Sequence, residues 1–506
     1  MTSMLTPRRL LALLLSCLAV SAALAQSTPN DNTVGEKISL SDAIQRALAK
    51  NYAIKVSGYD AAIAAAGVTQ ALGKFDPVLN GNYNYSSNVS PGYTDPNTGA
   101  ISPPVTINTD TYGASLDGLM PWGMTYQLGG TTTNTRGTFN AYANNYSSFA
   151  GITGTQPLLR NFGFSPTLAS IRIAQVTHGI SEWQFRQSVM DTITAVIYAY
   201  NDLNFAYANR RSAIRSRDLA AALLAENEKR FKVGSMSEYD VTSARSRTAS
   251  REDSIFQAEH QVSVAENALK QLIMDTKTPG LLSQHLVIEP PPPAPIVVVD
   301  PVADFAVALQ KRPDYQEAKL GLKRAGINAR LQRNQLLPRV DLVGSYGYNG
   351  SDTTFRGSRQ QVQDQDYRNY SWGVVVSVPL TFTTERGRYR AARLQKQQSE
   401  TQVDQVEQNI VVQLGNAADL IESGQKRVQA TRKARELAQQ TLDAEVKLLR
   451  AGQSSTFLVS TQQEILIGAE IGEAFAQADY QKALADYDRQ LGVTLEKLNV
   501  NIMPPK

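Results

Sequence analysis

The chain has 506 residues, of which 42% are hydrophobic and 19% are charged, and its formal net charge is +4. Its 50 basic residues nearly balance 46 acidic ones, which excludes the basic face that a nucleic-acid-binding protein needs. The single cysteine, Cys17, excludes a disulfide scaffold. The three histidines, at 178, 260 and 285, have no second ligand at metal-binding spacing, so we expect neither a metal nor a cofactor.

Residues 1–25 have the pattern of a secretory signal peptide. Arg8 and Arg9 precede an apolar run over 10–24, and Ala-Leu-Ala at 23–25 is typical of a cleavage site. About 15 apolar residues are too few for a spanning helix, which needs ~20. Cleavage after residue 25 would remove Cys17 and leave 48 basic against 46 acidic residues. The alternative is a lipoprotein that is acylated at Cys17.

No later stretch approaches ~18 consecutive apolar residues, so the sequence predicts no membrane-spanning helix. Inside lipid, only helices and closed β-barrels satisfy every backbone polar group. If the exported chain enters a membrane, we therefore expect it to do so through a barrel.

Four strand patterns precede long helical segments. Residues 79–89, 111–120, 340–348 and 372–378 alternate in polarity, with asparagines on one face of the first and Tyr, Gly and Leu on the other. This alternation suits a lipid-facing strand with a watery lumen. From the strands alone, an ordinary soluble sheet is an equally good interpretation.

Two long segments contain no proline, between Pro166 and Pro279 and between Pro379 and Pro504. The first carries an apolar face at helical spacing, close to a heptad seam. Its members are Ile173, Val176, Ile180, Trp183, Met190, Ile193, Ile197 and Tyr200. A helix over 168–233 would be about 100 Å long, which fits a rod, a coiled coil or a tube wall rather than a compact core.

Each long segment is predicted to be an antiparallel helical hairpin. Gly234 ends the first helix and Ser237 caps a return helix that lasts to about residue 274. The second hairpin has helices from about 389 to 451 and from about 455 to 498, with its tip at Gly452.

The two halves of the chain resemble each other. Ala-Leu-x-Lys at 47–50 recurs at 308–311, an offset of 261, whereas the tip residues Gly234 and Gly452 are offset by 218. The difference of 43 indicates an insertion in the first half, which we assign to a hairpin over 111–134 that turns at 121–123. We therefore predict a first repeat over 26–278, a proline-rich linker over 279–301 and a second repeat over 302–506.

Several local motifs, in their order, resemble the TolC-like outer-membrane efflux protein family. Leu-Ser-x-Ala-x-x-x-Ala-Leu at 40–48 is similar to the opening helix of that family, and Thr-Gln-Pro-Leu-Leu at 155–159 to its passage from strand to helix. Lys-Arg-Pro-Asp at 311–314 is similar to the start of its second repeat, and 231–241 to its first hairpin tip.

The resemblance implies an α+β membrane protein in the bacterial outer membrane. Its duplicated helical hairpins would build a periplasmic α-barrel, and its strands would join a transmembrane β-barrel shared by a homotrimer. Family members contribute four strands each to a twelve-stranded barrel, and the extra hairpin leaves open whether this chain contributes four or six. An adaptor protein and an inner-membrane transporter would complete an export duct. Its cargo would be drugs, metals or proteins, and all three cargo classes fit the sequence.

By resemblance, the two hairpin tips would bind the adaptor. The residues are Val233, Gly234, Ser235, Met236 and Ser237 in the first tip and Ala451, Gly452, Gln453, Ser454 and Ser455 in the second. A periplasmic gate would involve Asp240, Leu458 and Thr461; Leu458 and Thr461 occupy positions where some members carry an acidic ring. The alternative is that the tip residues only form turns.

Two other functions are alternatives to a channel. One is a periplasmic coiled-coil adaptor without its own barrel, which would usually contain one helical hairpin rather than two. An exported glycosidase would need paired carboxylates, for which Asp364/Asp366 and Asp419/Glu422 are the candidates. The first pair is predicted in a polar loop and the second on a solvated helix face, so we expect no enzyme.

Overall fold

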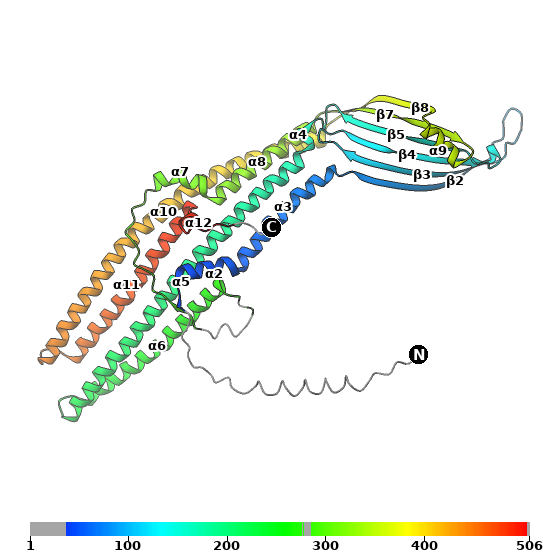
Figure 1. The fold of residues 1–506 in the computed structure, drawn as a ribbon. Coiled ribbons are helices and arrows are strands. Elements are labelled where there is room, and N and C mark those ends of the chain that lie inside the picture. The colour runs from blue at the N-terminus through cyan, green and yellow to red at the C-terminus, as the bar shows by residue number, and fades with distance from the viewer. Residues whose placement is uncertain (1–36, 276, 278–284, 503–506) are drawn as a thin grey trace, which may run out of the picture.

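The computed structural model describes residues 37–275, 277 and 285–502, so the predicted signal peptide and Cys17 lie outside the described residues. The molecule is elongated, with a bundle of long helices at one end and a six-stranded sheet at the other (Figure 1). Within these residues, no helix combines the length and apolarity needed to cross a bilayer.

Two antiparallel helical hairpins form the rod, as predicted. The first consists of α5 (Ala169–Lys232) and α6 (Glu238–Ile273), and the second of α10 (Thr383–Arg450) and α11 (Thr456–Leu491). With 64 residues, α5 is about 96 Å long. On its predicted apolar face, Val176, Met190, Ile193 and Tyr200 are buried and the other members are half-buried.

The bounds of the second hairpin differ from the prediction. α10 begins at Thr383 rather than at 389, and α11 ends at Leu491 rather than near 498. Gly492 ends α11 because it adopts a left-handed conformation with φ +76°, and the separate turn α12 (Thr494–Lys497) follows.

Each half begins with two shorter helices that meet at a sharp break. In the first half these are α2 (Leu40–Lys50) and α3 (Tyr52–Leu72), followed by the 3-10 turn η1 (Gly73–Phe75); in the second they are α7 (Pro301–Lys311) and α8 (Pro313–Asn334). Asn51 breaks the first pair and caps α3, accepting a 2.8 Å hydrogen bond from the Ala53 amide. Two-residue strands β1 (Lys37–Ile38) and β6 (Val287–Ile288) pair in parallel beside them.

The sheet is antiparallel throughout, with strand order β2-β3-β4-β5-β7-β8. Its strands are β2 (Val78–Ser90), β3 (Val105–Leu119), β4 (Thr125–Gly137), β5 (Tyr146–Pro157), β7 (Arg339–Asp352) and β8 (Tyr367–Ser377). β3 and β4 turn at residues 120–124 and occupy the middle of the first half's strands, so the chain contributes six strands to one sheet.

Short helical elements border the sheet. α4 (Phe164–Thr167) leads from β5 into α5, and the 3-10 turn η2 (Thr138–Asn140) follows β4. α9 (Phe355–Gln363) connects β7 to β8 at the end of the sheet far from the long helices (Figure 1).

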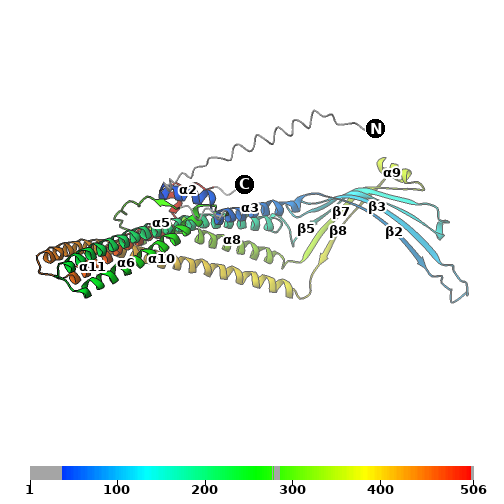
Figure 2. The same cartoon turned by 90° about the horizontal axis from the view of Figure 1, so that it is seen from below.

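The two faces of the sheet differ in polarity. Paired residues on one face are mostly apolar or aromatic, and include Leu79, Tyr83, Leu116, Leu128, Ile152, Leu342, Tyr346 and Trp372. The opposite face carries Asn80, Asn82, Ser115, Gln127, Thr131, Thr153, Ser345 and Ser371. Figure 2 shows that the sheet arches and that α9 lies on its convex side. Because α9 packs on the apolar face, the apolar face is the convex one and the polar face lines the concave side.

The hydrophobic core lies where the short helices pack on the long ones. One cluster joins α2, α5 and α6 around Val189, Met190 and Leu203, all fully buried. A second joins α7, α8, α10 and α11 around Ile410, Leu414 and Tyr487. The proline-rich linker is held to α11, because Tyr480 donates a 2.8 Å hydrogen bond to the Pro295 carbonyl.

Candidate docking site at the hairpin tips

The first tip is built from a glycine turn followed by a serine cap. Gly234 has φ +73°, and backbone hydrogen bonds of 2.9 Å from Gly234 to Phe231 and from Ser235 to Arg230 close the end of α5. The Ser237 hydroxyl then accepts a 3.2 Å hydrogen bond from the Asp240 amide, which starts α6.

The second tip repeats this geometry. Gly452 also has φ +73°, and the Gln453 amide donates a 2.9 Å hydrogen bond to the Leu448 carbonyl. The Ser455 hydroxyl accepts a 3.3 Å hydrogen bond from the Leu458 amide at the start of α11. The two tips therefore share one design and lie at the same end of the rod (Figure 1).

Most of the ten residues predicted at the tips are exposed. Val233 is 78% exposed, and only Met236 and Ser454 are half-buried. Ser454 donates its hydroxyl hydrogen to Glu445, which ties this residue to α10. A cluster of small, uncharged and exposed side chains at the end of a rod is a surface on which another protein's backbone can approach closely.

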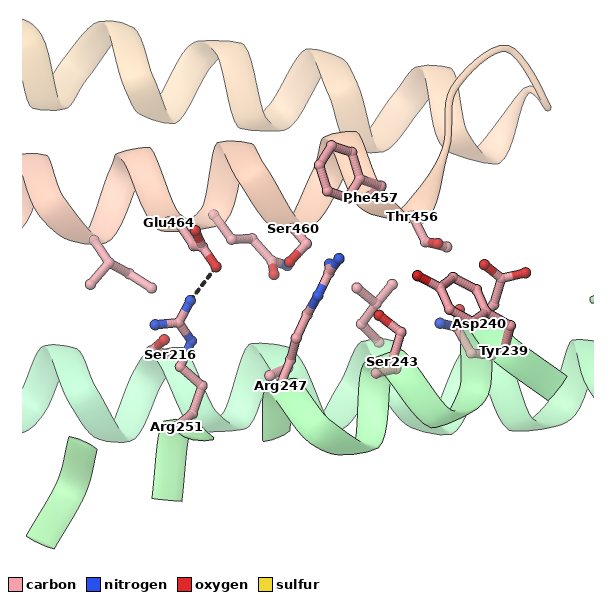
Figure 3. Close-up of a pocket in the computed structure, with 16 residues that line it drawn as sticks. Ser216, Tyr239, Asp240, Ser243, Arg247, Arg251, Thr456, Phe457, Ser460 and Glu464 are labelled. Atoms are coloured by element: carbon pink, nitrogen blue, oxygen red, sulfur yellow. Dashed lines mark hydrogen bonds and ion pairs between the residues drawn. The ribbon is translucent and has the colours of Figure 1, made fainter. Parts of the chain in front are cut away.

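A cleft of about 210 Å³ separates the two hairpins just behind the tips (Figure 3). α5 and α6 form one wall and α11 forms the other. The lining residues are Ser216, Ala220, Leu223, Asn227, Tyr239, Asp240, Ser243, Ala244, Arg247, Arg251, Thr456, Phe457, Ser460, Gln463, Glu464 and Ile467.

Two arginines of α6 bridge this cleft. Arg251 forms an ion pair with Glu464 of α11, and the Arg247 guanidinium lies 5.3 Å from the centre of the Phe457 ring (Figure 3). Farther from the tips, the guanidinium of Arg215 in α5 lies 2.7 Å from Glu470. Electrostatic contacts therefore hold the first hairpin to the second near the tips.

The structure separates the three predicted gate residues. Asp240 is half-buried and lines the cleft, but Leu458 and Thr461 of α11 are not among its lining residues. The Thr461 hydroxyl donates a 3.0 Å hydrogen bond within its own helix, to the Phe457 carbonyl. The prediction missed Arg247, Arg251 and Glu464, because only the fold brings α6 against α11.

The carboxylate pairs considered for catalysis have other roles. Asp364 forms the C-cap of α9, and Asp366 precedes β8. Glu422 is paired with Lys426 one turn along α10, and this hydrogen bond holds the pKa of Glu422 below its ordinary value. An exposed carboxylate in such a pair is typical of a solvated helix face.

A family model for outer membrane efflux proteins matches residues 43–273 and 306–493. The chain belongs to the outer membrane efflux protein family. This outer membrane efflux protein is 26% identical over 313 residues to the outer membrane efflux protein BepC of Brucella suis biovar 1, a match that covers 60% of the chain. The match spans 63% of the length of BepC, less than two thirds.

Two solved structures have the same fold. The outer membrane channel CmeC of Campylobacter jejuni superposes with a TM-score of 0.66 at 15% identity, covering 90% of this chain and 86% of CmeC. The outer membrane protein VceC of Vibrio cholerae superposes with a TM-score of 0.64 at 15% identity, and the match covers 90% of this chain and 96% of VceC. The efflux protein is thus located in the outer membrane.

Proposed function

We propose that three copies of this efflux protein form an outer-membrane channel that serves as the exit duct of a tripartite efflux pump or a type I secretion system. The observation that carries this proposal is the open sheet. Its edge strands, β2 and β8, have no further partner within the described residues. In lipid, unpaired backbone groups at these edges would cost several kcal/mol each, so neighbouring copies must supply the missing partners.

Three copies of a six-stranded sheet would close into an eighteen-stranded barrel. Family members with four strands per chain close with twelve. Barrel diameter grows roughly linearly with strand number, so this barrel would be about 1.5 times as wide. The apolar convex face would meet lipid and the asparagine-rich and threonine-rich concave face would line an aqueous lumen.

The protein would act as a passive conduit. A wide polar lumen lowers the barrier to transfer by supplying water along the whole path, and needs no binding pocket for its cargo. The two hairpins would extend into the periplasm and dock through the ten tip residues on an adaptor, which connects them to an inner-membrane transporter. The gate would lie behind the tips, where Asp240 lines the cleft, while Leu458 and Thr461 would act from another face of α11.

The shared order of elements supports a duplicated chain. Two short helices, strands and a long helical hairpin occur in this order in each half, and β3 and β4 are the extra strands of the first half. We therefore retain repeats over 26–278 and 302–506, joined by the linker over 279–301.

A periplasmic adaptor is the less favoured function. A soluble sheet would cover its apolar face, yet Trp372 on β8 is 78% exposed and Leu79 on β2 is also 78% exposed. These side chains suit contact with lipid or with another copy.

The first test is reconstitution of the full-length protein in planar bilayers after purification in mild detergent. We expect a trimer and discrete ion conductance that requires no energy source. A monomer that remains in solution without detergent and shows no conductance would refute the channel and favour the adaptor.

A further inference from the structure

Helix α9 covers the convex face of the sheet at the end far from the long helices. Ser358 is fully buried, and its hydroxyl lies 2.9 Å from the Ser148 hydroxyl of β5. A Cβ on Gly350 of β7 would overlap the Ser358 carbonyl oxygen, so the helix lies directly on the strand. The Phe355 ring packs edge-on against Tyr112 and Tyr146, at 6.3 and 5.9 Å between ring centres.

The opposite side of α9 is polar and basic. Arg356, Arg359, Gln360 and Gln363 are exposed and recur at the three- and four-residue spacing of one helix face. In the described part of the chain, neither arginine has an ion-pair partner; Arg359 lies 5.5 Å from the centre of the Phe355 ring. Arg368 of β8 adds a third positive charge on the convex face, opposite Tyr348.

The acidic groups next to α9 leave its arginines available. Asp352, just before the helix, accepts hydrogen bonds of 2.7 Å from the Thr354 amide and 2.8 Å from its hydroxyl. Asp364 and Asp366 follow the last turn of α9, at the end opposite Arg356.

The height of α9 above the base of the sheet matches the thickness of a bilayer's apolar core. Gly350, under α9, lies ten residue steps along β7 from Val340 at the base. At ~3.3 Å per residue and a strand tilt of ~40°, this run rises about 25 Å, the height of the apolar band of an outer-membrane barrel. Tyr346, Tyr348 and Tyr370 lie just below α9 on the same face, as an aromatic belt does at the interface.

We propose that α9 is a lipid-binding element that uses Arg356 and Arg359 to bind the phosphate groups of anionic lipids in the outer leaflet. The proposal rests on the proposed function, since it requires the convex face to contact lipid. A helix with this basic face could not lie among acyl chains, whereas at the headgroup level its guanidinium groups meet phosphates with suitable charge and geometry. α9 would thus fix the depth and orientation of the barrel's outer rim.

The test compares the wild-type protein with Arg356→Gln/Arg359→Gln, both full-length and in detergent micelles. Each is titrated with diphosphoryl lipid A, with its dephosphorylated form and with inorganic phosphate, and bound lipid is counted by native mass spectrometry. We expect the wild type to prefer the diphosphoryl form and the double variant to bind it at least about tenfold more weakly. Arg356→Lys/Arg359→Lys should retain most of the binding.

Lys229→Gln/Lys232→Gln is the matched control, because it removes two exposed charges at the same spacing from the far tip of α5. It should bind lipid A as the wild type does. The proposal would be overturned if Arg356→Gln/Arg359→Gln bound diphosphoryl lipid A as tightly as the wild type does. It would also be overturned if the wild type bound the dephosphorylated lipid as tightly as the diphosphoryl form. Competition by inorganic phosphate at the same affinity would also overturn it, since the site would then take a free anion rather than a lipid.

Flotation with liposomes separates the two levels of inference. If neither the wild type nor any variant floats with the vesicles, the proposed channel function fails. If all variants float and bind lipid A equally, the channel stands and only the role of α9 is refuted.

Discussion

Glycines with positive φ occur in two different environments in this protein. A Cβ on Gly452, at the second tip, would meet no atom within 4 Å, so a side chain there would project into open space. A Cβ on Gly492, after α11, would come 2.7 Å from the Lys311 carbonyl carbon and 2.9 Å from the Arg312 nitrogen. The first position tolerates bulk apart from backbone strain, whereas the second does not.

We therefore expect substitutions at these two glycines to have different effects. Gly452→Trp should cost about 1–2 kcal/mol of backbone strain, leave the trimer folded and abolish export by blocking adaptor docking. Gly492→Ala has the same strain plus a backbone overlap, and should lower the free energy of unfolding by more than about 2 kcal/mol. Thermal unfolding and a cellular export assay measure the two effects. Unchanged export by Gly452→Trp would remove the tip from the docking surface.

Tyr315 gives the helical bundle a pH dependence in the alkaline range. Its hydroxyl donates a 2.6 Å hydrogen bond to Glu407. This hydrogen bond is the main reason, and burial of the hydroxyl the second, why the pKa of Tyr315 rises from 10.0 to about 12. Because the folded pKa is the higher one, the stabilisation is complete below pH 10 and is lost as the pH rises to 12.

Replacing this tyrosine should change the profile of stability against pH. Tyr315→Phe should cost about 1 kcal/mol near neutral pH, where the hydrogen bond is intact. The difference from the wild type should shrink between pH 10 and 12, where Tyr315 ionises beside Glu407. Urea unfolding followed by helical circular dichroism at several pH values measures it, with Tyr59→Phe, an exposed tyrosine, as the control. If the stability difference between Tyr315→Phe and the wild type stayed constant from pH 10 to 12, ionisation of Tyr315 would not be the cause of the pH dependence.

At the scale of elements, the contact between α6 and α11 is electrostatic near the tips. The side chains of Arg251 and Glu464 are 29% and 53% exposed, so their ion pair contributes no more than about 1 kcal/mol. The cation-π contact between Arg247 and Phe457 contributes a similar amount. Links of this size can be broken without unfolding either hairpin, which suits elements that move apart.

Removing these links should separate the tips. We expect Arg247→Ala/Arg251→Ala to increase the population of longer distances between spin labels at Ser235 and Gln453, while the melting temperature changes little. Pulsed electron resonance measures the distance distribution. The control is Arg230→Ala, whose 2.9 Å partner, Glu226, lies on the same helix. An unchanged distribution in the double variant would mean that other contacts hold the hairpins together.

The local signals in the sequence predicted the hairpins but not their mutual arrangement. A glycine followed by a serine cap is a signal within one segment, so both tips were located to the residue and both hairpins are confirmed. The Arg251–Glu464 contact joins residues 213 positions apart, and nothing local to either of them predicts it. For the same reason the sequence could not show that Asp240 lines this cleft while Leu458 and Thr461 do not, since these positions depend on how α11 is rotated.

Short elements that depend on tertiary packing were also missed. The segment 355–363 is short, contains Gly357 and has few apolar side chains, so its helix signal is weak. The helix α9 is held by Ser148, Gly350 and two aromatic rings from three strands. The extra hairpin was predicted from the difference between two offsets, but its place within the sheet was not. Only the pairing of β3 with β2 and of β4 with β5 shows that it adds two strands.

At the scale of the whole molecule, the pair β3–β4 would set the width of the channel. β2 and β5 flank this pair and run antiparallel to each other, because each of the three intervening pairings is antiparallel. Removal of both strands would therefore let β2 pair directly with β5 without reversing any strand.

Deleting residues 105–137 should thus yield a trimer with four strands per copy and a barrel about two thirds as wide. Cryo-electron microscopy of the wild-type and shortened trimers measures the barrel diameter. When the tips are open, the size of the largest polymer that blocks conductance gives a second measure of the barrel width. Deleting β4 alone (125–137) is the matched control, because β3 would then face β5 in the parallel direction. That variant should fail to insert, since the remaining strands cannot close an antiparallel sheet. A wild-type trimer with twelve strands would show that β3 and β4 lie outside the barrel wall, and the width argument would fail.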